Sequence, residues 1–237
     1  MGSEQPVNYK DGAQALSGFV VKPAKPLKGK PGILILPAWM GIDEHAKNTA
    51  LKLAESGYMA FTADIYGVGN YPKSPQEAGP LSTKYKTDYK TYQQRIKLAL
   101  DELIKAGAAA DKIVIIGFCF GGTGALEAAR ANMPVKGVVS FHGGLGKAAD
   151  RITTSVGPKV LVCHGADDFF VPQPEIDGFQ KEMKGAKADW QMIYYPNAVH
   201  SFTDPAAGND NSKGAAYNAS AAKRSWEHMM VFLKEIL

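Results

Sequence analysis

The sequence predicts an α/β fold in which helices cover both faces of a mostly parallel central sheet. Short apolar runs, many of them β-branched, alternate along the chain with longer helical patterns, which is the order of elements in a parallel sheet with helical crossovers. Most of these runs are continuously apolar, as expected of strands buried on both faces. A sharp glycine-rich turn between one such run and a helix is the third observation.

The N-terminal part of the sheet is predicted from the pattern of each run and the residues that end it. Alternating side chains over residues 14–21 indicate an edge strand, and the continuous apolar run 33–36 indicates a buried one. Asp43 is a suitable N-cap for the helix that follows, and Gly57 stops that helix. The next strand is expected over residues 59–63.

An irregular segment separates these elements from the middle of the chain. Residues 64–83 carry repeated Gly and Pro together with Tyr66 and Tyr71, so we expect a long loop that forms the wall of a pocket. A helical pattern over residues 87–106 then leads to a buried strand over residues 113–116.

The rest of the chain continues the same alternation. Further strands are expected over residues 135–141, 160–163 and 190–194, with helices over residues 121–130, 174–183 and 219–237. Neither an internal repeat nor a linker interrupts the pattern, so we expect one domain over residues 1–237.

Composition excludes several classes of protein. Apolar residues make up 45% of the chain and charged residues 21%, which is typical of a soluble globular protein. The net charge of +4 comes from Lys and Arg spread along the sequence, which argues against nucleic acid as a partner. No run approaches the about 18 consecutive apolar residues of a membrane span, so no membrane partner is expected either.

The N-terminus lacks the pattern of a signal peptide, so a cytoplasmic location is expected. Met1-Gly2-Ser3 leaves open a removed leader, with a periplasmic or secreted location as the alternative. The two cysteines, Cys119 and Cys163, are too few for a disulfide framework. Since no Cys/His cluster has zinc-ligand spacing, we expect free thiols, no metal and no organic cofactor.

The glycine-rich turn at residues 117–122 matches the pattern G-x-nucleophile-x-G, directly after an apolar strand and before a helix. Gly117 and Gly121 allow the strand and the helix to approach closely. The central residue is Cys119, and a helix N-terminus favours its thiolate form. The alternative, a packing turn with an inert buried cysteine, is weaker because the motif and its context agree.

In the α/β-hydrolase fold that this turn indicates, the nucleophile is followed in the sequence by an acid and then a histidine. The loop after the strand 160–163 carries Asp167 and Asp168, and the loop after the strand 190–194 carries His200, the candidate base. An oxyanion hole requires backbone N–H groups from the residue after the nucleophile and from an earlier loop. Phe120 and Trp39 occupy those places.

The other histidines rank lower as candidates. His45 and His228 fall on predicted helices without a reactive partner and are interpreted as surface residues. His142 and His164 lie at strand ends near the same edge of the sheet, where a structural role is favoured over a place in the pocket.

Taken together, these motifs resemble the dienelactone hydrolase family over almost the whole chain. The matching segments are, in order, Tyr9-Lys10-Asp11-Gly12, Pro37-Ala38-Trp39-Met40-Gly41, Ala63-Asp64-Ile65-Tyr66-Gly67, Gly117-Phe118-Cys119-Phe120-Gly121-Gly122, Ser140-Phe141-His142-Gly143-Gly144, His164-Gly165-Ala166-Asp167-Asp168 and Val199-His200-Ser201-Phe202. The resemblance implies Cys119 as nucleophile and His200 as base. It implies Asp168 as the acid, because the family's acid stands just before the Phe-Val-Pro end of this loop.

The sequence departs from the family pattern at two places. Ala38 replaces a Glu that usually lies near the thiol, and Asp204 stands where dienelactone-opening members place a basic residue. The substrate need not be a dienelactone. The expected substrate pocket contains Ala38, Tyr66, Tyr85, His142 and Phe202.

The leading hypothesis is a hydrolase that cleaves a lactone or small carboxylic ester through an acyl-cysteine intermediate on a Cys119-Asp168-His200 triad. The alternatives are a thioesterase with the same triad and a non-enzymatic binding protein on a decayed hydrolase fold. Redox sensing by Cys119 is weaker, since no second cysteine lies beside it. We expect a small-molecule partner and a monomer or small homo-oligomer.

Overall fold

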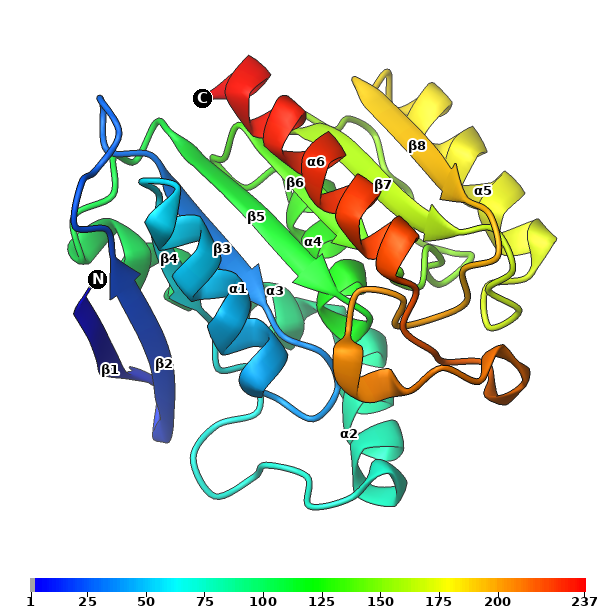
Figure 1. The fold of residues 1–237 in the computed structure, drawn as a ribbon, viewed down its shortest axis with the longest axis horizontal. Coiled ribbons are helices and arrows are strands. Elements are labelled where there is room, and N and C mark those ends of the chain that lie inside the picture. Colours follow the sequence, from blue (N-terminus) through cyan, green and yellow to red (C-terminus); the bar gives the residue numbers. More distant parts are fainter. Residues whose placement is uncertain (1–2) are drawn as a thin grey trace.

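The computed structural model describes residues 3–237, and its strands form one eight-stranded sheet in the order β1-β2-β4-β3-β5-β6-β7-β8 (Figure 1). β2 pairs antiparallel with β1 and β4, while every pairing from β4 across to β8 is parallel. The prediction of a mostly parallel sheet is therefore confirmed. The strands are β1 (Ser3–Asp11), β2 (Gln14–Lys22), β3 (Gly32–Leu36), β4 (Met59–Thr62), β5 (Ile113–Phe118), β6 (Gly137–Phe141), β7 (Lys159–Gly165) and β8 (Trp190–Tyr195).

Helices cover both faces of this sheet, as predicted. α1 and α6 lie on the near face in Figure 1, and α4, which directly follows Cys119, lies behind the sheet with α3. The helices are α1 (Glu44–Glu55), α2 (Pro75–Thr87), α3 (Tyr89–Lys105), α4 (Phe120–Arg130), α5 (Gln173–Gly185) and α6 (Ala219–Ile236). No helix in the described part of the chain is long and apolar enough to cross a membrane.

Each central strand sends alternate side chains into two separate cores. In β3, Ile33 and Ile35 pack towards α1 and α6, while Leu34 and Leu36 pack towards α3 and α4. All four side chains are completely buried, and each contributes roughly 1.5–3 kcal/mol of hydrophobic free energy. Burial on both faces explains why these strands read as continuous apolar runs.

Two expectations about the N-terminal half are wrong. The edge of the sheet is formed by β1, not by residues 14–21, which form the inner strand of a hairpin. The sequence did not indicate β1 because most of its side chains are exposed, so it lacks an apolar alternation.

The predicted loop over residues 64–83 is also too long, because α2 begins at Pro75 with Ser74 as its N-cap. Gly79 and Pro80 lie inside this helix. Because both residues disfavour helices, the sequence pattern did not indicate one here.

In the turn between β5 and α4, segments of backbone pack closely against one another. Cys119 has φ of 55° and ψ of −116°, a strained conformation for a residue with a side chain. A Cβ atom at Gly117 would overlap the carbonyl oxygen of Gly121, and one at Gly121 would overlap that of Leu36. Only glycines at these positions let β3, β5 and α4 meet.

We expect Gly121→Ala to lower the free energy of unfolding by at least about 3 kcal/mol, because its methyl group must force α4 away from β3. Chemical denaturation measures this quantity. Gly178→Ala is the matched control, since Gly178 is an exposed residue of α5 with nothing within 4 Å of the added Cβ. That control should be unchanged or more stable by about 0.5–1 kcal/mol. Equal stabilities of the two variants would contradict the packing described.

Candidate active site

Three side chains from three separate loops meet at the carboxyl ends of the parallel strands. Cys119 lies between β5 and α4, Asp168 between β7 and α5, and His200 in the loop after β8. The Nε2 atom of His200 is 2.9 Å from the Sγ atom of Cys119, and its Nδ1 atom is 2.9 Å from Oδ2 of Asp168. One imidazole is thus hydrogen-bonded to both a thiol and a carboxylate, which is the arrangement of a nucleophile, a base and an orienting acid.

The adjacent carboxylates Asp167 and Asp168 lie in different surroundings. Asp168 is only 4% exposed, and its carboxylate also accepts a hydrogen bond of 3.0 Å from the Phe170 N–H group. Asp167 is exposed, and its backbone N–H group donates to the Ala198 carbonyl at 3.0 Å. Asp168 is therefore the carboxylate in contact with the imidazole, while the backbone of Asp167 joins the acid loop to the histidine loop.

Backbone hydrogen bonds hold His200 in place. Its N–H group donates to the Gly214 carbonyl and its own carbonyl accepts from the Ala216 N–H group, each at 3.1 Å. The ring of Phe170 packs edge-on against the imidazole, with 5.7 Å between ring centroids. These contacts leave the imidazole little freedom to turn away from Cys119.

The electrostatics of the pair favour a charged thiol. Burial by itself raises the pKa of Cys119, but the charge and hydrogen bond of His200, together with the Phe120 N–H group, lower it below the ordinary value. Burial also lowers the pKa of His200, but the Cys119 charge and the hydrogen bonds that the ring makes to Asp168 and Cys119 raise it to about 10. Both shifts favour a thiolate–imidazolium pair at neutral pH. Cys163 is different, because burial raises the pKa of its thiol to about 12.

Of the two predicted oxyanion donors, Phe120 belongs to the turn itself and Trp39 to a loop packed against it. Phe120 is the first residue of α4, so its N–H group has no partner within the helix. The loop that carries Trp39 packs against the turn, since a Cβ atom at Gly121 would lie 2.7 Å from the Pro37 carbonyl oxygen. A tight turn in which Gly41 N–H donates to the Ala38 carbonyl at 3.0 Å fixes that loop.

The predicted pocket residues differ in how deeply they are buried. Tyr66 and Tyr85 are buried, and their hydroxyl groups contact the Trp39 carbonyl and the Arg95 guanidinium. Ala38 is half-buried in the loop after β3. The expectation that Phe202 lines the pocket is wrong, because its ring is completely buried in the core on the α1/α6 side of the sheet.

Two histidines have neighbours that the sequence did not indicate. His45 is half-buried, not a free surface residue, and its Nε2 atom is 3.1 Å from the Thr203 hydroxyl oxygen. The same oxygen is 2.7 Å from Nε2 of the buried His142, whose ring packs edge-on against His200. His45 also borders a cavity of about 600 Å³ between α1 and α6. These contacts depend on distant loops, so no local pattern predicts them.

The remaining two histidines contact tyrosines of β8. His164 is buried against Tyr194, and burial lowers its pKa. His228 is an exposed residue of α6, as expected, and its Nδ1 atom is 2.7 Å from the Tyr195 hydroxyl. Within residues 3–237, no group of three or more His, Cys, Asp or Glu side chains is placed to hold a metal ion.

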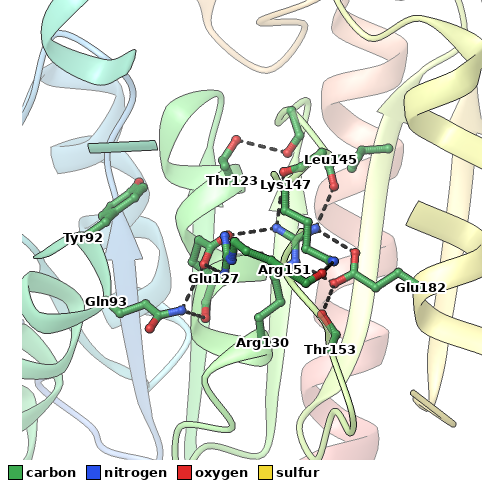
Figure 2. Close-up of polar contacts among 12 residues, drawn as sticks. Tyr92, Gln93, Thr123, Glu127, Arg130, Leu145, Lys147, Arg151, Thr153 and Glu182 are labelled. Atoms are coloured by element: carbon green, nitrogen blue, oxygen red, sulfur yellow. Dashed lines mark hydrogen bonds and ion pairs between the residues drawn. The ribbon is translucent and has the colours of Figure 1, made fainter. Parts of the chain in front are cut away.

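A buried ionic cluster joins α4, the helix after Cys119, to α5, the helix after the loop of Asp168 (Figure 2). Arg130 of α4 makes two parallel hydrogen bonds to Glu182 of α5, at 2.8 and 2.9 Å. Glu127 accepts from Arg130 and Arg151, and Arg130 also donates to the Leu145 carbonyl. The cluster fixes α4, α5 and the loop after β6 relative to one another.

Comparisons with known proteins agree with this architecture. A model described as the dienelactone hydrolase family matches residues 16–237. A putative carboxymethylenebutenolidase of Saccharolobus solfataricus is 25% identical and covers 98% of this chain and 99% of its own. The structure of a dienelactone hydrolase-like promiscuous phosphotriesterase from metagenomic libraries is 36% identical with a TM-score of 0.88, over 99% of this chain and 98% of its own. A structure named m3DLH is 33% identical with a TM-score of 0.93, over 100% and 99% of the two chains.

We expect iodoacetamide at pH 6.5 to alkylate Cys119 at least about tenfold faster than Cys163, because only the thiolate reacts. A lowered pKa keeps more of Cys119 deprotonated as the pH falls, so its rate should decline at a lower pH than that of an ordinary thiol. His200→Ala leaves the burial but removes the imidazolium, so the pKa should rise and most of the advantage should disappear. Mass spectrometry of the labelled peptides measures both rates. A rate for Cys119 that rises only near pH 8 to 9, with or without His200, would show that burial dominates.

Proposed function

The chain belongs to the dienelactone hydrolase family and is a hydrolase of lactones or esters; we propose that it works through an acyl intermediate on Cys119. The observation that carries this proposal is the pair of 2.9 Å contacts from His200 to Cys119 and Asp168. We treat the whole chain as one hydrolase domain, which the single sheet formed by all eight strands supports. The expected substrate is a small molecule.

In the first half of the proposed reaction, the Cys119 thiolate attacks the carbonyl carbon of the ester. The N–H groups of Phe120 and Trp39 stabilise the negative oxygen of the tetrahedral intermediate. When the intermediate collapses, the alkoxide leaves and takes a proton from the His200 imidazolium. An acyl thioester on Cys119 and a neutral His200 remain.

The second half restores the charged pair. His200 removes a proton from a water molecule, which attacks the thioester carbonyl, and the Cys119 thiolate leaves as the carboxylic acid forms. Asp168 accepts a hydrogen bond from Nδ1 of His200 throughout, which orients the ring and stabilises its cationic form. For a lactone substrate, the alcohol and the acid remain parts of one product.

Ala38 bears on how the thiol becomes charged. A Glu at this place would offer a second proton acceptor near the sulfur, which alanine does not. The only basic side chain in hydrogen-bond contact with Cys119 among the described residues is His200. We therefore propose that the enzyme rests as a thiolate–imidazolium pair and does not need substrate to form it.

Cleavage of phosphotriesters is a second candidate activity. It is favoured by the 36% identical relative described as a promiscuous phosphotriesterase, which covers 99% of this chain. A thiolate can attack phosphorus as it attacks a carbonyl carbon, with the same N–H groups facing the developing charge. A hydrolysis screen over lactones, aryl esters, thioesters of graded acyl length and an aryl phosphotriester would rank these substrates.

We expect Cys119→Ala to abolish turnover of the best substrate in that screen and to leave the fold intact, because glycines hold the geometry of the turn. Cys119→Ser should retain only weak activity, since an alcohol is far less acidic than a thiol. Rates are compared with wild type alongside circular dichroism. Activity of a folded Ala variant within a few-fold of wild type would remove the nucleophile role and, with it, the proposed mechanism.

The two adjacent carboxylates provide a matched pair of variants. Asp168→Asn should lower kcat at least about tenfold more than Asp167→Asn, because only Asp168 contacts the imidazole and sets its tautomer. Steady-state kinetics of both variants measure the difference. If the Asp167 variant is the more damaged, the acid has been assigned to the wrong residue.

A further inference from the structure

The ring of Phe120 lies in a stack of three buried aromatic residues. Tyr66 is parallel to one side of it, with 5.7 Å between centroids and an interplanar angle of 10°. Tyr92 stacks on it at 4.6 Å and 14°. Tyr66 is 2% exposed and Tyr92 is completely buried. The residue that follows the nucleophile is thus held by its side chain as well as by its helix.

Each tyrosine hydroxyl also binds the backbone of one predicted oxyanion donor. The Tyr66 hydroxyl donates to the Trp39 carbonyl at 2.7 Å, and the Tyr92 hydroxyl donates to the Phe120 carbonyl at 2.8 Å. For Trp39, the preceding peptide group is held too, since the Ala38 carbonyl accepts from Gly41 N–H. A buried hydroxyl needs a hydrogen-bond partner, and each of these two finds its partner on the backbone of a residue beside the thiol.

Helix α4 leaves room for the second of these contacts. A Cβ atom at Gly124 would overlap the Tyr92 hydroxyl oxygen, so the absence of a side chain there allows the hydroxyl to reach the first turn of the helix. Tyr92 comes from α3 and Tyr66 from the segment before α2. Each of the two backbone sites is therefore held by a tyrosine from a different part of the chain.

From these contacts we propose that Tyr66 and Tyr92 are positioning residues that hold the N–H groups of Trp39 and Phe120 on the oxyanion of the acyl intermediate. The inference rests on the proposed function, because it assumes that Cys119 forms this intermediate. An oxyanion hole accelerates the reaction only if its donors are aligned before the charge develops. Phe120 follows the strained Cys119, and Trp39 lies in a loop, so neither donor is aligned by regular secondary structure alone.

The tyrosines stay protonated beside the charged thiol. Burial raises the pKa of both, and the negative charge of Cys119 raises it further. Each hydroxyl therefore stays protonated at neutral pH and remains a hydrogen-bond donor there.

The test replaces each hydroxyl and keeps each ring. Tyr66→Phe and Tyr92→Phe are assayed with 4-nitrophenyl acetate for kcat and KM, and separately for the rate at which iodoacetamide alkylates Cys119. Alkylation displaces iodide from carbon and forms no oxyanion, so it reports on the thiolate and His200 alone. We expect each variant to lose about 10–100-fold in kcat, with KM and the alkylation rate within about twofold of wild type.

Tyr195→Phe is the matched control. Its hydroxyl is also hydrogen-bonded in a buried ring, at 2.7 Å from His228, but on the opposite face of the sheet. It should keep kcat within about twofold and reveal any general cost of removing a buried hydroxyl. Thermal unfolding confirms that each variant is folded, and Tyr66→Phe carries the test alone if Tyr92→Phe does not fold.

Two outcomes would overturn the inference. One is a folded Tyr66 or Tyr92 variant that keeps kcat within about twofold of wild type. The other is a parallel fall of kcat and alkylation rate, which would mean that the hydroxyls support the nucleophile and not the oxyanion hole. Failure of the proposed function is a separate result, because it would appear as an active Cys119→Ala enzyme.

Discussion

Backbone crowding where β3, β5 and α4 meet determines where the thiol of this site lies, and the other reactive groups are arranged around it. The absence of side chains at Gly117 and Gly121 lets the strand turn directly into the helix, and the short turn leaves Cys119 in a strained conformation at its apex. The strain has a chemical consequence. The thiol lies at the start of α4, where unpaired N–H groups and the helix dipole favour negative charge.

Charge in so buried a place requires compensation. His200 supplies the opposite charge to Cys119 and is itself held by Asp168, so three ionisable groups share one continuous set of hydrogen bonds. His200 is the member that contacts both others, so removing it would leave the buried thiol and the buried carboxylate without their opposite charge. Because position 38 is alanine, no carboxylate at that position competes with the imidazole for the thiol proton.

The scaffold around the triad resists relative movement of its parts. Arg130 and Glu182 join α4 to α5 (Figure 2), and α5 directly follows the loop of Asp168. Buried ion pairs contribute little net stability compared with apolar packing, but they tolerate few alternative arrangements. In this protein, they and the stacked aromatic residues fix the separation between Cys119, Asp168 and the surrounding backbone.

The sequence by itself determined the parallel sheet, the turn at Cys119 and the order of the candidate side chains, because each follows from local chemistry. Continuous apolar runs require burial on both faces, and G-x-C-x-G between a strand and a helix permits few backbone paths. Only the tertiary structure decided what depends on contacts between distant segments. β1 is exposed and pairs without an apolar pattern, Phe202 lies in the core, and Tyr92 reaches the backbone of Phe120 from another helix. A side chain's hydrophobicity predicts that it is buried, but its partner depends on how the elements pack, which no local pattern contains.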